Sequence, residues 1–437
     1  MEFIWNLVLG AWNFIISVRN VMKKYIKDLV KKAKEANYKL AKLESERKNA
    51  ILYEMADALL ANKEFILKEN AKDVKNAFKA KMAASFIDRL TLNEKRLDEM
   101  SASLKEIAKL ADPVGKTISE AVRPNGLNIK KVRSPIGVIL VIYEARPNVT
   151  SDCIGLLFKS SNVAILRGGK DSLNSNKAIG KILKEAIKNS GLNFTPFFIV
   201  ENPNHKAVDL LLKENEYIDL VIPRGGETLI RKVVKASTIP VIKHYKGVCH
   251  IFIDSNVDTA KALKICVNAK VQRPSVCNAV EKILVHKDIA KYFLPLLKNE
   301  FDKYKVKIKG DAKTCKILKG VVRAKEEDWF AEYLDLIVTA KVVDGIEEAI
   351  SHVNFYGSHH TDSILTRNTE NAKKFVKEVD SACCFVNIST RFSDGFQFGL
   401  GAEIGISTDK LHARGPMGLE ELTTYKWVVV GDGQIRE

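Results

Sequence analysis

The sequence predicts an α/β protein that contains two parallel-sheet domains in series and one small β hairpin. Short, continuous apolar segments alternate with amphipathic helical stretches, and this pattern occurs twice along the chain. Apolar strands that are joined by helical crossovers form parallel sheets with both faces covered. A chain of 437 residues is also too long for one ordinary hydrophobic core.

The predicted elements follow in chain order. Residues 23–110 are expected to be helical, because apolar residues recur there at helical spacing. The strands predicted for the first sheet are residues 138–143, 162–166, 197–200 and 218–222. The strands predicted for the second sheet are residues 248–253, 282–285 and 334–339. Residues 423–430 are expected to form an exposed strand, one that could pair with another subunit.

The N-terminal segment differs from the rest of the chain. Residues 3–18 are strongly apolar, yet they are shorter than the roughly 20 residues that a membrane span needs. No basic region precedes them and no small-residue cleavage site follows, which argues against a secretory signal. We expect residues 1–21 to be an upstream extension of unknown role or a misplaced start, with an interfacial anchor as the alternative.

Composition narrows the function classes. The net charge of +17 should attract anions, but no stripe of base-stacking aromatic residues accompanies it, so nucleic-acid binding is not expected. The seven cysteines show no paired spacing that would indicate disulfides or a metal site, and we expect none. This cysteine usage fits a reducing compartment, so a cytoplasmic location is expected and a membrane location is not.

Two predicted strands end in the same kind of loop, written AILRGGK and DLVIPRGGE. Glycine at a strand-to-helix turn lets backbone N–H groups approach a phosphate, and the helix N-terminus favours its negative charge. A simple turn is the alternative, and the dinucleotide fingerprint GxGxxG is absent. The residues concerned are Arg167, Gly168 and Gly169 in the first loop and Pro223, Arg224, Gly225 and Gly226 in the second.

Asn148 follows the first strand of the first sheet, in the segment VIYEARPNVTSD. Ligands of open α/β sheets usually bind at the carboxyl ends of the strands. The Asn148 amide could therefore donate to a developing oxyanion, although Pro147 and Asn148 could equally form a turn.

Cys277 lies in a polar loop, QRPSVCNA, beside Arg273. A nearby cation or helix terminus favours the thiolate form, which attacks acyl carbon. An inert, buried cysteine is the alternative for this position.

The order of these motifs resembles one family. RPNVTSD, ILRGG, IPRGGE, QRPSVCNA, VNISTRFSDG and LHARGPMGLEELTTYKW occur as they do in the γ-glutamyl phosphate reductases, or glutamate-5-semialdehyde dehydrogenases, of the aldehyde dehydrogenase superfamily. The resemblance covers about residues 22–436. It implies an aldehyde-dehydrogenase-like fold and the NADPH-dependent reduction of L-glutamyl 5-phosphate to L-glutamate 5-semialdehyde, with release of phosphate, in proline biosynthesis. It also implies a homodimer, and glutamate 5-kinase as a transient partner.

The resemblance also divides the chain. It implies a cofactor-binding domain of residues 22–114 and 136–246 and a catalytic domain of residues 247–395. Residues 115–135 and 411–437 would form an oligomerisation hairpin.

The resemblance assigns roles to the candidate residues. Cys277 matches the nucleophile that holds the acyl group as a thioester, and Asn148 matches the oxyanion donor, with the Cys277 backbone N–H as the second donor. Arg167 and the glycine loops would hold NADPH. The candidates for the substrate phosphate or carboxylate are Arg273, Asn278, His412 and Arg414, although His412 could equally cap a loop.

One absence distinguishes the family from its rivals. Hydrolytic aldehyde dehydrogenases carry a Glu that activates water, whereas the corresponding residues 243–247 contain no carboxylate. An ordinary aldehyde dehydrogenase is therefore the less favoured reading, and a basic nucleic-acid or membrane-surface protein with an inactive core is a second rival. The sequence departs from the common family pattern at Ile388, Phe396 and Gln397, none of which is the nucleophile.

Overall fold

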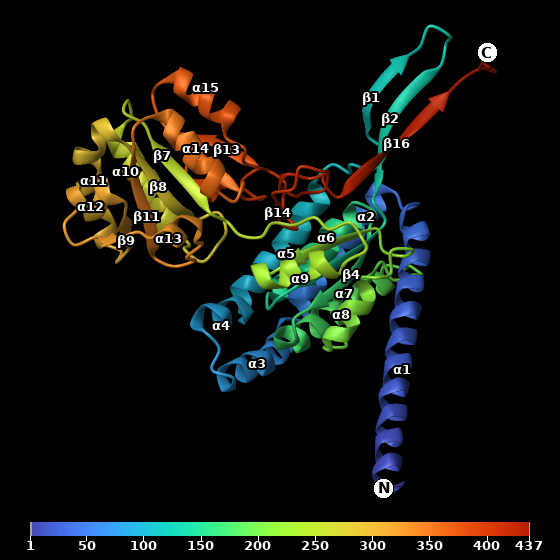
Figure 1. Ribbon diagram of the computed structural model, residues 1–437. Coiled ribbons are helices and arrows are strands. Elements are labelled where there is room, and N and C mark those ends of the chain that lie inside the picture. Colours follow the sequence, from blue (N-terminus) through green and yellow to red (C-terminus); the bar gives the residue numbers. More distant parts are fainter. Residues whose placement is uncertain (1, 437) are drawn as a thin grey trace. The chain divides into compact units, whose positions relative to one another are not determined.

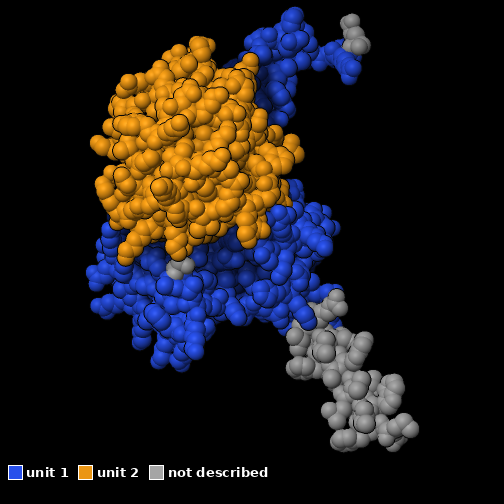
Figure 2. Space-filling model, turned by 60° about the vertical axis from the view of Figure 1, so that its left-hand side comes forward, with its two compact units in different colours: residues 1–242, 400–404, 418–437 blue, residues 243–399, 405–417 orange. Residues whose placement is uncertain are grey.

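The computed structural model describes residues 2–436, with the side chains of all of them except residues 2–19 and Ser85. The chain forms two compact units (Figure 2). The first unit contains Met1–Ile242, Leu400–Ile404 and Gly418–Glu437, and the second contains Lys243–Gly399 and Gly405–Met417.

A four-stranded parallel sheet forms the centre of the first unit, in the order β5-β4-β3-β6. Its strands are β3 (Val138–Tyr143), β4 (Val163–Gly168), β5 (Phe197–Ile199) and β6 (Leu220–Arg224). All six residues of β3 are buried, as expected for a central strand covered on both faces. The sequence prediction of these four strands is confirmed, with boundaries that differ by at most two residues.

Helices cover both faces of this sheet (Figure 1). Right-handed crossovers place α6 (Pro147–Lys159) and α7 (Leu173–Asn189) on one face and α8 (His205–Leu211) on the other, where α1 (Glu2–Leu40) also packs. The remaining helical segments of the unit are α2 (Ser45–Ala61), α3 (Lys63–Lys79), α4 (Ala84–Leu90), α5 (Glu94–Lys109), η1 (Lys170–Ser172) and α9 (Glu227–Ala236). Of these, α2, α3 and α5 form an outer layer over α6 and α7.

The apolar residues 3–18 belong to helix α1, which continues to Leu40. The side chains of this N-terminal segment lie outside the described residues, so its role stays a prediction. Among the residues that are described, no helix is long and apolar enough to cross a membrane.

A three-stranded antiparallel sheet extends from the first unit (Figure 1). It contains β1 (Thr117–Val122), β2 (Asn128–Pro135) and β16 (Thr423–Val430), with β2 in the middle. The predicted C-terminal strand is confirmed. All eight of its residues pair with β2 of the same chain, from Thr423 opposite Pro135 to Val430 opposite Asn128.

The second unit is built on a seven-stranded parallel sheet with the order β10-β9-β11-β8-β7-β12-β13. The strands are β7 (Cys249–Ile253), β8 (Val280–His286), β9 (Lys307–Gly310), β10 (Val322–Arg323), β11 (Ile337–Val343), β12 (Thr361–Leu365) and β13 (Cys383–Val386). The helical segments are α10 (Thr259–Val271), α11 (Lys287–Asp302), α12 (Ala312–Ile317), α13 (Glu326–Phe330), α14 (Ile346–Tyr356), α15 (Thr369–Glu378) and η2 (Thr390–Phe392).

The sequence prediction found three of these seven strands. β12 escaped it because the strand begins with polar residues, although Asp362 and Ser363 are fully buried in the structure. Asp362 is satisfied there, since its carboxylate accepts the backbone N–H of His250 at 2.7 Å. A polar residue with a partner inside the sheet leaves no apolar signal in the sequence.

The unit boundaries differ from the sequence division near the C-terminus. The prediction assigns residues 411–417 to the hairpin, whereas the structure groups them with the second unit. The reason is that β15 (Gly415–Pro416) pairs with β14 (Ile406–Ser407).

Candidate active site

Cys277 lies in the loop that joins α10 to β8, at the amino edge of the seven-stranded sheet. The residue is partly exposed. A Cβ atom added to Gly247 would lie 1.8 Å from the Cys277 carbonyl oxygen, so only glycine lets these two backbones approach so closely. The Cys277 loop is therefore packed tightly on the segment that leads into β7.

The thiol of Cys249 makes a hydrogen bond to the backbone of the same loop. Cys249 is buried, and its Sγ donates to the Cys277 carbonyl oxygen at 3.2 Å. Burial raises the pKa of the Cys249 thiol well above its ordinary value. Cys249 therefore stays protonated as a hydrogen-bond donor, while Cys277 is the thiol that reaches the surface of the loop.

Asn278 and Arg391 lie beside Cys277. The Asn278 amide donates to the Ser393 carbonyl at 2.8 Å and accepts a hydrogen bond from the Arg391 guanidinium. The same guanidinium donates through Nε to Gln272 at 2.8 Å. Arg391 is not among the residues that the sequence analysis selected, because it is more than a hundred positions away from the loop that it binds.

A carboxylate also lies beside this loop. Glu332 accepts the backbone N–H of Gly247 at 2.9 Å. The residues 243–247 contain no carboxylate of their own, so Glu332 comes from a different part of the chain. Sequence reasoning missed it, since nothing near Glu332 in the sequence points to the Cys277 loop.

The remaining candidates of the second unit do not share one arrangement. Arg273 is exposed in the Cys277 loop. Arg414 donates to Asp380 at 2.7 Å, and hydrogen bonds from Lys410 and Arg414 lower the pKa of Asp380 to about 2. His412 is exposed, with a positive φ of 69°. The structure thus gives Arg414 a carboxylate partner and keeps Arg273 in the same loop as Cys277.

Asn148 occupies the first turn of α6, after the carboxyl end of β3. It is exposed, and its amide donates to the Asp152 carboxylate at 3.2 Å. Burial raises the pKa of Asp152 to about 6, against the hydrogen bonds from Ser103 and Asn148. This hydrogen bond uses one of the two amide hydrogens, so the Asn148 amide can still donate to another acceptor.

The first glycine loop follows β4. Arg167 is 6% exposed, and its guanidinium donates to the Pro203 carbonyl at 3.0 Å. A Cβ atom on Gly168 would lie 2.1 Å from the Asn176 amide nitrogen, so packing alone requires glycine there. A Cβ atom on Gly169 would make only ordinary contacts, the nearest at 3.6 Å. Packing therefore explains why residue 168 is glycine, but it does not explain why residue 169 is.

The second glycine loop lies between β6 and the N-terminus of α9. The Glu144 carboxylate accepts the Gly226 backbone N–H at 3.1 Å, and a Cβ atom on Gly225 would lie 2.6 Å from the Glu144 side chain. A Cβ atom on Gly226 would meet nothing within 4 Å. A helix N-terminus with open space in front of it fits an anionic group such as a dinucleotide phosphate.

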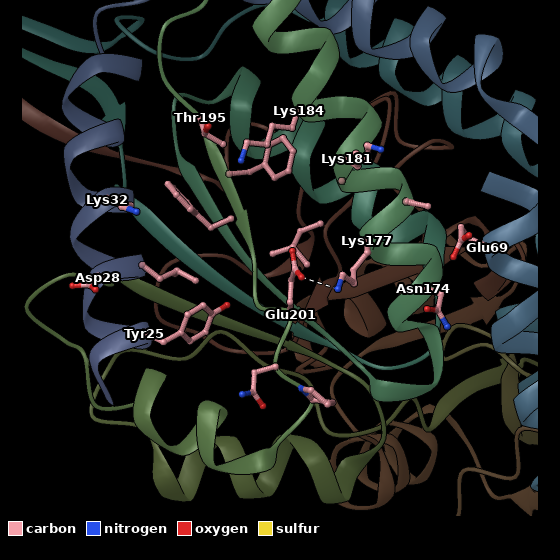
Figure 3. A pocket seen from close by; sticks show the side chains of 18 of the residues that line it. Tyr25, Asp28, Lys32, Glu69, Asn174, Lys177, Lys181, Lys184, Thr195 and Glu201 are labelled. Atoms are coloured by element: carbon pink, nitrogen blue, oxygen red, sulfur yellow. Dashed lines mark ion pairs between the residues drawn. The ribbon is translucent and has the colours of Figure 1, made fainter. Parts of the chain in front are cut away.

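A cavity of about 1340 Å³ lies elsewhere in the first unit (Figure 3). It is lined by α1, α3, α7 and the edge strand β5, and an ion pair of 2.7 Å joins Lys177 to Glu201 beside it. None of the candidate residues lines it. This cavity is therefore separate from the candidate site residues.

A thiol on a loop at the edge of one sheet and glycine loops in a separate α/β unit fit the aldehyde dehydrogenase class that the sequence suggests. Comparison with known proteins supports this class. The model of the aldehyde dehydrogenase family matches residues 12–341. The chain therefore belongs to the aldehyde dehydrogenase family, a family of oxidoreductases.

Within this family its relatives are γ-glutamyl phosphate reductases. The enzyme of that name from Thermodesulfovibrio yellowstonii is 53% identical over 416 residues, which are 95% of this chain and 100% of the relative. That from Caldanaerobacter subterraneus subsp. tengcongensis is 54% identical over 407 residues, or 93% and 98% of the two chains. The crystal structure of γ-glutamyl phosphate reductase from Thermotoga maritima matches with a TM-score of 0.91 and 48% identity, over 94% of this chain and 100% of that one. The resemblance found in the sequence and the expected fold are confirmed.

Proposed function

We propose that the protein reduces L-glutamyl 5-phosphate to L-glutamate 5-semialdehyde with NADPH, releases phosphate, and serves proline biosynthesis. The observation that carries this proposal is the Cys277 thiol, which is partly exposed on a loop that glycine packing and three side-chain hydrogen bonds hold in place. Relatives that are more than half identical over nearly their whole length support the substrate.

The chemistry begins with the Cys277 thiolate. Its sulfur attacks the acyl carbon of the acyl phosphate, a C–S bond forms, and phosphate leaves with the electron pair of the broken C–O bond. The backbone N–H of Cys277 makes no hydrogen bond within the described part of the chain, so it can donate to the oxyanion. We assign the second donor to the Asn148 amide, on the resemblance of its motif.

NADPH, when bound, supplies the hydride that converts the thioester carbon to the aldehyde level. The C–S bond then breaks, the aldehyde carbonyl forms, and Cys277 leaves as a thiolate that is ready for the next cycle. Gly225 and Gly226 at the start of α9, together with Gly169, are the residues we assign to the cofactor phosphates. Arg167, Pro223 and Arg224 lie at the carboxyl ends of β4 and β6, beside these glycines. The Arg167 side chain is buried there.

Loss of the thioester to water is disfavoured by the side chains around Cys277. No carboxylate occurs in residues 243–247, and Lys243 is held by Asp409 at 2.7 Å. Glu332, the carboxylate beside the Cys277 loop, accepts the Gly247 backbone N–H. Phosphate is then the natural partner of the acyl group in the reverse direction. Among the substrate candidates we assign Arg273 and Asn278 to the acyl phosphate, and His412 and Arg414 to the distal end of the substrate.

The reverse reaction tests this proposal. The wild type is given glutamate semialdehyde and NADP, with and without inorganic phosphate, and NADPH is followed by absorbance. We expect sustained turnover only with phosphate, and none in Cys277→Ala. The control Cys315→Ala replaces another partly exposed cysteine and should keep full activity. Equal rates with and without phosphate would contradict the reductase and favour an ordinary aldehyde dehydrogenase.

We also propose that the three-stranded sheet forms a homodimer. One face of β16 exposes apolar side chains that nothing in the described chain covers: Tyr425 is 48% exposed, Trp427 60% and Val429 53%. Exposed apolar strands with a free edge usually mark an interface. Light scattering should give a dimer for the wild type and a monomer for Trp427→Glu, whereas Lys426→Glu, in the same strand, should stay dimeric if the apolar face is what associates. A dimeric Trp427→Glu would contradict this assignment.

A further inference from the structure

The segment VNISTRFSDG is one of the motifs that carry the family resemblance. None of its residues, however, has a role in the chemistry described above. In the structure its central part, η2, lies beside the Cys277 loop. Ser389 caps η2 by accepting the backbone N–H of Arg391, and the Ser393 carbonyl accepts the Asn278 amide. The Ser393 carbonyl therefore fixes the segment to the loop that carries Cys277, whereas the Ser389 cap holds the turn of η2 itself.

Arg391 makes the most direct connection. Its Nε donates at 2.8 Å to Gln272, which lies five residues before Cys277 in the sequence. Its Nη1 donates to Asn278, the residue that follows Cys277. One planar guanidinium thus joins the two sides of the loop. A guanidinium presents its donors in a rigid fork, so it can fix the separation of two acceptors, which the single flexible ammonium of lysine cannot do.

The charge of Arg391 is also placed near the reacting atom. Burial lowers the pKa of Arg391, and the titratable groups that interact with it are Asp394, Arg273, Cys277 and Cys249. A guanidinium remains protonated at all ordinary pH values, so this side chain brings a permanent positive charge to the surroundings of the thiol.

From this geometry we propose that Arg391 is a positioning residue: it bridges Gln272 and Asn278 and so holds Cys277 in the orientation from which its sulfur attacks. The inference rests on the proposed function for its consequence in catalysis, but the orientation of Cys277 is measurable without any substrate. Misplacement of a reacting atom by about 1 Å commonly costs about 100-fold in rate.

The test compares Arg391→Met, Arg391→Lys, Gln272→Met and the double variant of Gln272 and Arg391 to Met. The matched control is Arg367→Met, which removes another guanidinium of the same unit that pairs with Asp258 at 2.9 Å. For each protein, Cys277 is alkylated with iodoacetamide at several pH values and the modified peptide is quantified by mass spectrometry. The kcat and KM values of the phosphate-dependent reaction and the melting temperature are measured in parallel.

We expect Arg391→Met to lower kcat by about 100-fold with KM changed by less than about 3-fold, and to lower the alkylation rate of Cys277 by about 10-fold. Arg391→Lys should recover part of the alkylation rate, through its charge, but little of kcat. Gln272→Met, at an exposed position that folding tolerates, should lower kcat by about 5-fold, and the double variant should be no worse than Arg391→Met, because both changes break one bridge.

The proposal is overturned if Cys277 in Arg391→Met is alkylated as fast as in the wild type and in Arg367→Met. It is also overturned if the effects of the two single changes multiply in the double variant. Should Arg391→Met fail to fold, Gln272→Met and Arg391→Lys give the same comparison. If no variant, nor the wild type, reduces the acyl phosphate while the alkylation pattern holds, the proposed function fails and the positioning role stands.

Discussion

The two parallel sheets of this protein use opposite edges. In the first unit the glycine loops and Asn148 follow the carboxyl ends of β3, β4 and β6, where open α/β sheets usually bind their ligands. In the second unit Cys277 precedes β8 and Gly247 precedes β7, so Cys277 lies at the amino ends of the strands. The rule about carboxyl edges therefore locates the glycine loops and Asn148 but does not locate Cys277.

The glycines of the two edges show the same contrast. Gly226 has open space where a Cβ atom would be, whereas at Gly247 the backbone of Cys277 fills that space. Packing within the chain therefore requires glycine at position 247 but not at position 226. Alanine substitutions at the two positions should consequently fail in different ways.

The largest effect is expected from Gly247→Ala. The new Cβ atom would lie 1.8 Å from the Cys277 carbonyl oxygen, so the nucleophile loop must shift. We expect kcat to fall by about 100-fold or more, together with a lower melting temperature. Gly345→Ala is the control, because its nearest contact would be an ordinary 3.6 Å to a side chain. Wild-type kcat in Gly247→Ala would show that the close approach is not needed.

A smaller and more selective effect is expected from Gly226→Ala. No atom of the protein within 4 Å opposes the added methyl group, so the melting temperature should not change. A methyl group between the helix N-terminus and a dinucleotide phosphate should raise the Kd for NADPH by about 10-fold, or about 1.4 kcal/mol. Calorimetric titration with NADPH measures this directly. An unchanged affinity would remove Gly226 from the cofactor site.

Asp152, in helix α6 of the first unit, should also make the stability of the protein depend on pH. The folded pKa of Asp152, about 6, exceeds the ordinary value of 3.8, so its ionisation opposes folding, and stability is lost as pH rises from about 4 to about 6. Asp152→Asn should therefore raise the free energy of unfolding by about 1–2 kcal/mol at pH 8 and by little at pH 4. Urea unfolding at both pH values checks this, and a gain that is equal at both would contradict the cause.

The smallest effect is expected from Glu144→Gln. The Glu144 carboxylate accepts the Gly226 N–H at the N-terminus of α9, where it opposes the approach of a phosphate. Removing its charge should tighten NADPH binding by about 2- to 3-fold at low salt, and the gain should shrink at high salt. Tighter binding that persisted in 1 M salt would point to a cause other than charge.

Sequence reasoning reached the parts of this fold that are continuous in the chain. The four strands of the first sheet and the strand of residues 423–430 follow from apolar runs and are confirmed. Strand β12 was missed because buried Asp362 and Ser363 look like surface residues until their partners are known. Short edge strands such as β10, with two residues, leave too little pattern to detect.

The candidate site divides in the same way. Cys277 and the two glycine loops were found through their motifs and through the family resemblance. Arg391, Glu332 and Cys249 were missed, because each meets the Cys277 loop only after the chain has folded. Gly247 ends the carboxylate-free segment of residues 243–247, but the need for glycine there comes from the Cys277 backbone, which lies beside it only in the folded chain.

The central claim is that Cys277 carries the acyl group. Glutamate semialdehyde and NADP are mixed with a stoichiometric amount of enzyme in the absence of phosphate, quenched in acid, and digested for peptide mass spectrometry. We expect one burst of NADPH per active site and a glutamyl thioester on the Cys277 peptide, which disappears when phosphate is added before the quench. A burst without acylated Cys277, or acylation of another cysteine such as Cys249, would contradict the account.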